Sequence, residues 1–141
     1  MLDPLDANLL DFHATVHLLT GNFEKTLDIA DPGRERVVEN TRVIHRNAFG
    51  VASFHLGFFE EAIESFQDAA EYGDPISELS LTFLAASHQG AGRSEKASEI
   101  IRELRSNWPK YRPEIALPKF YRHQQHADQV LASLRAAGWD F

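Results

Sequence analysis

Two pairs of histidines have spacings that could bind a metal ion. His13 and His17 lie four residues apart in the segment HATVH, which on a helix places both side chains on one face. This segment has no glutamate after its first histidine and no evident third ligand, so it differs from the zinc-protease motif. His123 and His126, in RHQQHAD, could join Asp128 as a second set of ligands. We interpret the first pair as packing residues and the second as surface residues, with a helical metal-binding domain as an alternative.

No other group of residues indicates catalysis. The glutamates of GFFEEAIESF, at positions 60, 61 and 64, fit the solvent side of an amphipathic helix better than a carboxylate site. The segment HQGAGRSEK, residues 88–96, has glycines and basic residues but lacks the spacing of a phosphate-binding loop. Serines, histidines and aspartates are scattered without the strained turn of a nucleophile, and there are no cysteines. We therefore expect no enzyme activity, no cofactor and no bound metal.

The composition favours a single domain in a reducing compartment. The chain has 141 residues, of which 43% are hydrophobic and none is a cysteine, as expected for one cytoplasmic domain. The N-terminus lacks the basic cluster of a signal peptide, and no apolar run approaches the roughly 18 residues that span a membrane. A net charge of −7 argues against nucleic-acid or anionic-lipid partners. Residues 102–141 differ, with 7 Lys/Arg against 4 Asp/Glu, so the last third is a distinct piece.

Three glycines recur at a nearly constant spacing. Gly21, Gly57 and Gly92 are 36 and 35 residues apart, and a stretch of helical period precedes and follows each one. A small residue stands seven positions before each glycine, which would let two helices approach closely. These small residues are Ala14, Gly50 and Ala85. Prolines at positions 75 and 109 cannot continue a helix, so each marks the step to the next unit.

This pattern resembles the tetratricopeptide repeat, a helix–turn–helix unit of about 34 residues. In the middle copy the matching residues are Gly50, Gly57, Phe59, Ala62, Phe66 and Pro75, whereas the first copy has Thr26 where alanine is usual. The resemblance implies an all-α solenoid of about three helical hairpins, over residues 7–40, 41–75 and 76–109. Asp31, Pro32 and Gly33 predict that the second helix ends near Ala30, before a separate turn or short helix over residues 34–39.

Residues 110–141 depart from the repeat and predict a C-terminal cap. A short helix is expected between or just after Pro113 and Pro118, and a second over about residues 127–137, with Gly138 as its stop. Such a segment would cover the last apolar face of a solenoid. The ending LRAAG (134–138) is similar to that of tetratricopeptide arrays at the C-termini of bacterial class III adenylate/guanylate cyclases and winged-helix regulators. This likeness, with Leu2–Pro4 in the phase of a repeat ending, implies a fragment, the regulatory region of a larger signalling protein.

The resemblance also implies a concave groove lined by the first helix of each hairpin. Chaperone-binding members of the family hold a C-terminal carboxylate there with lysine, asparagine and arginine, and the corresponding residues of this chain do not reproduce that set. We expect the groove to bind a peptide or helix of a protein partner, or a segment of its own parent chain. Its predicted lining is Asp11, Phe12, Thr15, Asn47, Val51, Phe54, His55, Thr82, Phe83 and Gln89.

Two other outcomes remain open for this groove. The chain's own cap, or a second copy, could cover some of its side chains. A homodimer is the main alternative to partner binding, with cap residues such as Trp139 and Phe141 buried across a two-fold axis. Sedimentation at several concentrations would test the dimer, and a monomer at high concentration would contradict it.

The groove assignment makes Phe54 and Phe83 binding residues. Substitution of either by alanine or a charged residue is therefore expected to abolish partner capture without unfolding the chain. Capture that survives both substitutions would show that the assignment is wrong.

Overall fold

Every regular element in the described part of the chain is a helix. The structure is a computed structural model and describes residues 15–36, 43–71 and 76–140. A short helix covers residues 15–20, followed by α2 (Phe23–Arg36), α3 (Val43–His55), α4 (Phe59–Glu71), α5 (Glu78–Gly90), α6 (Ser94–Asn107), α7 (Pro113–Phe120) and α8 (Gln124–Ala136). The predicted all-α class is confirmed for these residues. None of their helices has both the length and the apolar character that crossing a membrane requires.

The same backbone turn joins the two helices of each hairpin. Gly21, Gly57 and Gly92 have φ angles of 86°, 84° and 82°, in the left-handed region that glycine enters most readily. In each turn the N–H that follows the glycine donates to the carbonyl five residues earlier, at 2.8 Å in all three cases. These bonds run from Asn22 to His17, from Phe58 to Ser53 and from Arg93 to His88. The periodic glycines of the sequence therefore mark equivalent helix ends.

Close contact between the paired helices depends on small side chains. Thr26, Ala62 and Ala97 occupy equivalent positions in the second helices, and all three are fully buried. The Thr26 hydroxyl is accommodated because it donates to the carbonyl four residues earlier at 3.0 Å. Gly50 of α3 lies against the ring of Phe66, and a Cβ at Gly50 would come within 2.7 Å of that ring. The size of these few side chains therefore limits how closely the helices pack.

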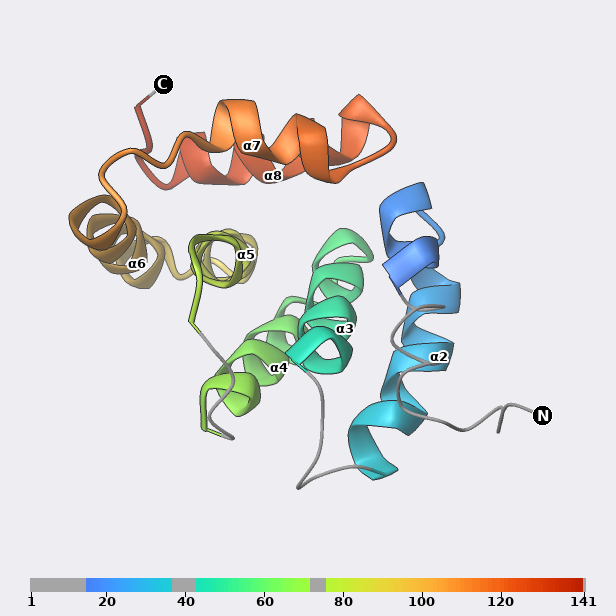
Figure 1. Ribbon diagram of the computed structural model, residues 1–141. Helices are drawn as coiled ribbons and strands as arrows, with labels where there is room; N and C mark the ends of the chain where they lie inside the picture. The colour runs from blue at the N-terminus through green and yellow to red at the C-terminus, as the bar shows by residue number, and fades with distance from the viewer. Residues whose placement is uncertain (1–14, 37–42, 72–75, 141) are drawn as a thin grey trace.

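The hairpins pack against one another in chain order (Figure 1). α2 contacts α3, α4 contacts α5, and α5 contacts α8. Aromatic side chains join these layers, since the ring centroid of Phe83 on α5 lies 6.3 Å from those of both Phe54 on α3 and Phe66 on α4. In Figure 1, α7 and α8 lie together above α5 and extend toward the first helix. A backbone hydrogen bond of 3.0 Å from the Arg122 N–H to the Leu19 carbonyl completes that contact.

The predicted end of α2 near Ala30 is wrong, because the helix continues to Arg36. Pro32 lies inside this helix, although a proline lacks the N–H that would donate to the carbonyl four residues earlier. The loss of one backbone hydrogen bond therefore does not end the helix here. Ala30 is fully buried in the core, which fixes the turn that precedes the proline.

The C-terminal segment forms the predicted pair of helices. α7 begins at Pro113, a favourable first residue for a helix, and α8 ends just before Gly138, whose φ is 103°. The apolar residues on the inner side of this last helix and its cap, Val130, Leu131, Leu134 and Ala137, are buried. Trp139 is buried as well, with its ring centroid 6.1 Å from that of Tyr111, so it offers no surface for a dimer. Phe141 lies outside the described residues.

Gly50→Val is expected to lower the free energy of unfolding by about 2–3 kcal/mol, because the new side chain overlaps the Phe66 ring in a packed core. Ala70→Val on the exposed side of α4 is the matched control. It also adds a β-branched residue to a helix, and is expected to change the free energy of unfolding by less than about 1 kcal/mol. Urea unfolding followed by circular dichroism measures both variants. Equal losses in the two would contradict the close approach at Gly50.

Candidate functional site

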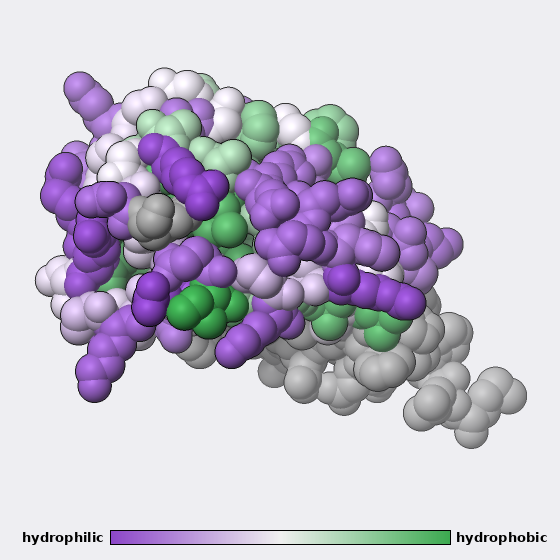
Figure 2. Space-filling view, turned by 90° about the horizontal axis from the view of Figure 1, so that it is seen from above, coloured by the Kyte–Doolittle hydropathy of each residue, from purple (hydrophilic) through white to green (hydrophobic). Residues whose placement is uncertain are grey.

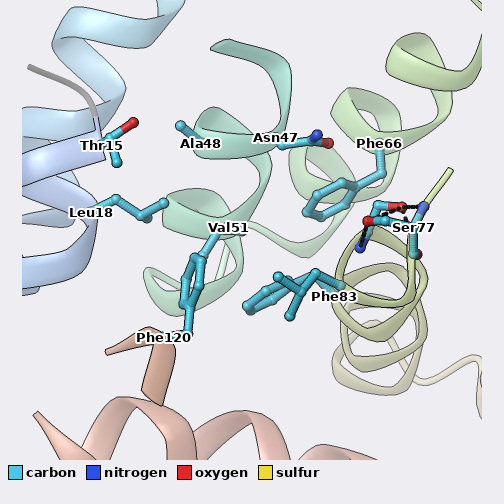
Figure 3. A pocket seen from close by; sticks show the side chains of 11 residues that line it. Thr15, Leu18, Asn47, Ala48, Val51, Phe66, Ser77, Phe83 and Phe120 are labelled. Carbon is cyan, nitrogen blue, oxygen red and sulfur yellow. Dashed lines mark hydrogen bonds between the residues drawn. The ribbon is translucent and has the colours of Figure 1, made fainter. Parts of the chain in front are cut away.

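An apolar pocket lies where the first helix, α3, α4 and α5 meet the end of α7. Its volume is about 270 Å³. Figure 3 shows its side chains converging from these separate helices, with Phe120 of α7 closing one end. Pockets for drug-sized ligands run from about 300 to 1,000 Å³, so this one fits one or two apolar side chains better than a whole cofactor. The lining residues are Thr15, Leu18, Asn47, Ala48, Val51, Phe66, Ser77, Leu79, Ser80, Phe83 and Phe120.

The serines at this pocket are already bonded within the chain. Ser77 caps α5, and its hydroxyl accepts the Ser80 N–H at 3.2 Å while the Ser80 hydroxyl accepts the Ser77 N–H at 2.9 Å. Asn47 differs, because its Oδ1 is buried without a hydrogen-bond partner among the described residues. None of the described residues that line the pocket carries a charge. The pocket is therefore suited to an apolar group, with one amide oxygen left to accept a hydrogen bond.

The structure brings four of the predicted groove residues to this pocket, namely Thr15, Asn47, Val51 and Phe83. Asp11 and Phe12 lie outside the described residues. The remaining four, Phe54, His55, Thr82 and Gln89, do not line it. Four of the ten predicted groove residues therefore lie together in this pocket, near the start of α5.

Two of those four residues, Thr82 and Gln89, lie on α5, and Thr82 makes internal contacts. The Thr82 hydroxyl donates to the Glu78 carbonyl at 2.6 Å and lies 2.9 Å from the Tyr111 hydroxyl, so it anchors the segment before α7. Burial, with that hydrogen bond opposing it, raises the pKa of Tyr111. Gln89 is half-buried, and its Oε1 has no hydrogen-bond partner in the described part of the chain.

The expectation that Phe54 and Phe83 form an accessible binding surface is wrong. Phe54 is 1% exposed and Phe83 is 2% exposed, so both belong to the core. Phe83 presents one edge to the pocket, whereas Phe54 packs among other aromatic rings. Substitution of either residue would alter the packing of α3 and α5 before it altered the capture of a partner.

His55 is covered by the chain's own cap. Its Nδ1 lies 2.8 Å from Oε1 of Gln129 on α8, and its Nε2 lies 2.5 Å from the hydroxyl of Tyr121. The ring of Phe23 stacks on it at a centroid distance of 4.4 Å. Burial lowers the pKa of His55 to about 4, the hydrogen bond that its ring makes to Gln129 opposes that shift, and the nearby His126 adds to it. Burial also raises the pKa of Tyr121 well above its usual value.

His126 fills the space above the first glycine turn. A Cβ at Gly21 would lie 2.5 Å from Cε1 of His126, so the imidazole occupies the room that the missing side chain leaves. The His126 ring also lies edge-on to Phe23, with centroids 4.9 Å apart, and 5.6 Å from the ring of His55. Burial, followed by the charge of the neighbouring His123, lowers the pKa of His126. The cap and the N-terminal hairpin therefore meet through histidines.

These histidines are not arranged as metal ligands. In residues 15–36, 43–71 and 76–140 there is no group of three side chains that could hold a metal ion. Asp128 accepts a hydrogen bond from Gln124 at 2.9 Å, and the rings of His123 and His126 are 5.8 Å apart. His13 lies outside the described residues, and Nδ1 of His17 is 3.4 Å from Nδ2 of Asn22.

Sequence reasoning missed the contribution of the cap to the pocket. Phe120 lines the pocket from the end of α7. The next residue, Tyr121, places its hydroxyl against His55. The two adjacent aromatics after Pro118 were a usable signal, because a short helix that ends in large rings must bury them against a neighbour. Also missed were Leu18, Ala48, Phe66, Ser77 and Ser80.

In comparisons with known proteins, neither a family model nor a curated protein matches this chain.

Phe83→Ala is expected to lower the free energy of unfolding by about 3–5 kcal/mol, because it removes a buried ring that packs against those of Phe54 and Phe66. Phe58→Ala is the matched control, since Phe58 is 50% exposed, and a change within about 0.5 kcal/mol is expected. Chemical unfolding of the two variants beside the unmodified chain measures both. If the Phe83→Ala chain were as stable as the Phe58→Ala chain, the assignment of Phe83 to the core would be wrong.

Proposed function

We propose that this chain is a non-catalytic protein-interaction module of the tetratricopeptide type. In this proposal the three helical hairpins form a short solenoid, and α7 and α8 cap it. Its task is to hold an apolar side chain of a partner peptide or helix in the pocket between the first helix, α3 and α5. The repeated glycine turns support the architecture, since equal turns at equal spacing are what a repeat array requires.

The observation that carries the proposal is the pocket itself. Its walls come mainly from the first helices of successive hairpins, with Phe66 of α4 and Phe120 of α7. None of the described lining residues is charged, and the two serines are already bonded within the chain. An apolar group that enters would therefore displace water from apolar walls without breaking internal hydrogen bonds. Full burial of one aliphatic or aromatic side chain contributes about 1.5–3 kcal/mol, which is a tenfold to hundredfold effect on affinity.

The outer side of the cap is mostly hydrophilic (Figure 2). Figure 2 looks down on that side and shows mostly hydrophilic side chains, with small hydrophobic patches among them. Ile115 on α7 is one exposed apolar residue, with 45% of its surface accessible. Scattered apolar residues of this kind are normal on a protein surface, whereas a concave pocket whose described lining is uncharged suits an apolar ligand.

The wider context is also part of the proposal. The likeness of residues 134–138 to the ends of regulatory arrays supports a place in a larger bacterial signalling protein. The lack of cysteines fits a cytoplasmic setting. The partner is then a protein or peptide, or a segment of the parent chain itself.

A displayed library of twelve-residue peptides tests the pocket directly. Peptides that bind the unmodified chain are expected to share one large apolar residue. Asn47→Trp places an indole in the pocket and is expected to weaken their binding at least tenfold, as measured by fluorescence anisotropy.

Gln67→Trp, at an exposed position of α4, is the matched control and should bind as the unmodified chain does. Circular dichroism verifies that both variants are folded. A library that yields no binder, or binders that Asn47→Trp retains at full affinity, would refute the proposed site.

A further inference from the structure

The seam between the cap and the rest of the chain is built around one imidazole. The His55 ring lies at the end of α3 and touches residues of three other parts, Phe23 of α2, Tyr121 after α7, and Gln129 of α8. Both of its nitrogens face partners that belong to the cap. The seam also contains the backbone hydrogen bond from the Arg122 N–H to the Leu19 carbonyl and the packing of the His126 ring against Gly21.

The hydrogen bonds of His55 are those of a neutral ring. The amide oxygen of Gln129 can only accept, so Nδ1 carries the proton and donates to it at 2.8 Å. Nε2 is then the acceptor, and the Tyr121 hydroxyl donates to it. A second proton on Nε2 would make that nitrogen a donor, so the Tyr121 hydroxyl could only accept from it and the buried Tyr121 O–H would lose its own acceptor.

The surroundings of His55 do not compensate a positive charge. The titratable side chains that contact the ring are Tyr121 and His126, and the other ring neighbours are Phe23 and Phe54. Among the described residues, no carboxylate contributes to the shift in its pKa. The charged residues next along the packed elements, Glu24, Lys25, Arg122, His123 and Asp128, are exposed to solvent.

We propose that His55, His126, Tyr121 and Gln129 form a proton-sensitive latch, which holds the cap against α3 and the N-terminal hairpin while the imidazoles are neutral and releases it when they are protonated. Release separates this seam only. The other side of the cap stays attached, because α8 packs on α5 and the Ser98 hydroxyl donates to the Ala137 carbonyl at 2.8 Å. Phe120, next to Tyr121, moves with the seam, so release would also open the end of the pocket, a consequence that rests on the proposed function.

The direction and range of the pH response follow from the depressed pKa of His55. In the closed form this pKa is about 4, whereas an exposed histidine titrates near 6.5. The contribution of His55 to the stability of the closed form is therefore fully present above pH 6.5 and is lost as the pH falls toward about 4. The ratio of closed to open molecules falls about tenfold per pH unit in this window, and at pH 5.5 it is about tenfold lower than at pH 7.5. Protonation of His126 acts in the same direction.

A distance measurement across the seam tests the latch without any partner. The chain has no cysteines of its own. Cysteines placed at the exposed positions Asp28 on α2 and Ala132 on α8 are therefore the only thiols that fluorescent dyes can label. Energy transfer between them is expected to fall reversibly between pH 7.5 and 5. A second pair at Glu64 on α4 and Arg102 on α6 reports on the hairpins and is expected to stay constant. Constant transfer across the seam, or equal changes in both pairs, would overturn the proposal.

Two matched variants separate the latch from general instability. Gly21→Ala and Gly57→Ala strain similar left-handed turns, with φ angles of 86° and 84°, but a Cβ meets His126 at Gly21 and nothing within 4 Å at Gly57. Gly21→Ala is expected to lower energy transfer across the seam already at pH 7.5, whereas Gly57→Ala leaves it unchanged. His55→Phe removes the ionisable ring, so most of the pH response should vanish. Equal transfer in the two alanine variants, or a full response in His55→Phe, contradicts the latch.

These outcomes remain distinct from those of the peptide test. Energy transfer is recorded without ligand, so the latch can fail while the pocket binds peptides. In the reverse outcome the seam opens with pH but the chain captures no peptide. The latch would then stand, and the proposed binding function would be wrong.

Discussion

The arrangement of this chain depends on a turn that reverses the backbone at a left-handed glycine. In each hairpin this glycine directs the second helix back along the first, and the bond across five residues fixes the angle. Because the three turns are alike, the second helices present equivalent positions to the first ones, and the fully buried Thr26, Ala62 and Ala97 all occur at the same offset. The stacking of the hairpins and the position of the pocket both follow from that repetition.

The aromatic cluster that joins the hairpins also determines what the pocket can bind. Phe83 is shared by the core and the pocket wall, with Phe120 from the cap 6.0 Å away between centroids. The site is therefore made of side chains that already stabilise the fold. Such a site is shaped before any ligand arrives, which lowers the entropic cost of binding. It also leaves little freedom for substitution, because few lining residues are spared a structural role.

The turns and the cap could be predicted from the sequence because they have local signals. Glycines at a constant spacing, a proline at the start of α7 and a glycine after α8 each act on the backbone where they stand. The division of α3 into core and pocket sides could not be predicted. Val51 reaches the pocket and Phe54 does not, although both are apolar and lie on adjoining sides of one helix. Only the position of the neighbouring helices decides between them.

The predicted helix end at Ala30 was wrong and the contacts of His55 were not predicted, for different reasons. At Ala30 the segment Asp31–Gly33 has the residues of a new helix start, but it continues α2, because one missing hydrogen bond at Pro32 does not end the helix. At His55 no local rule applied, because its partners Tyr121 and Gln129 are 66 and 74 residues further along the chain. Polar contacts between distant segments leave no periodic trace in a sequence.

That separation has a consequence for how the chain folds. Contacts within each hairpin join residues close in sequence, so they form with little loss of loop entropy. The hydrogen bond between His55 and Gln129 closes a loop of 74 residues, and it can form only once the cap exists and the hairpins between are stacked. We therefore expect the seam to assemble late in folding and to be among the first regions to open in native-state hydrogen exchange.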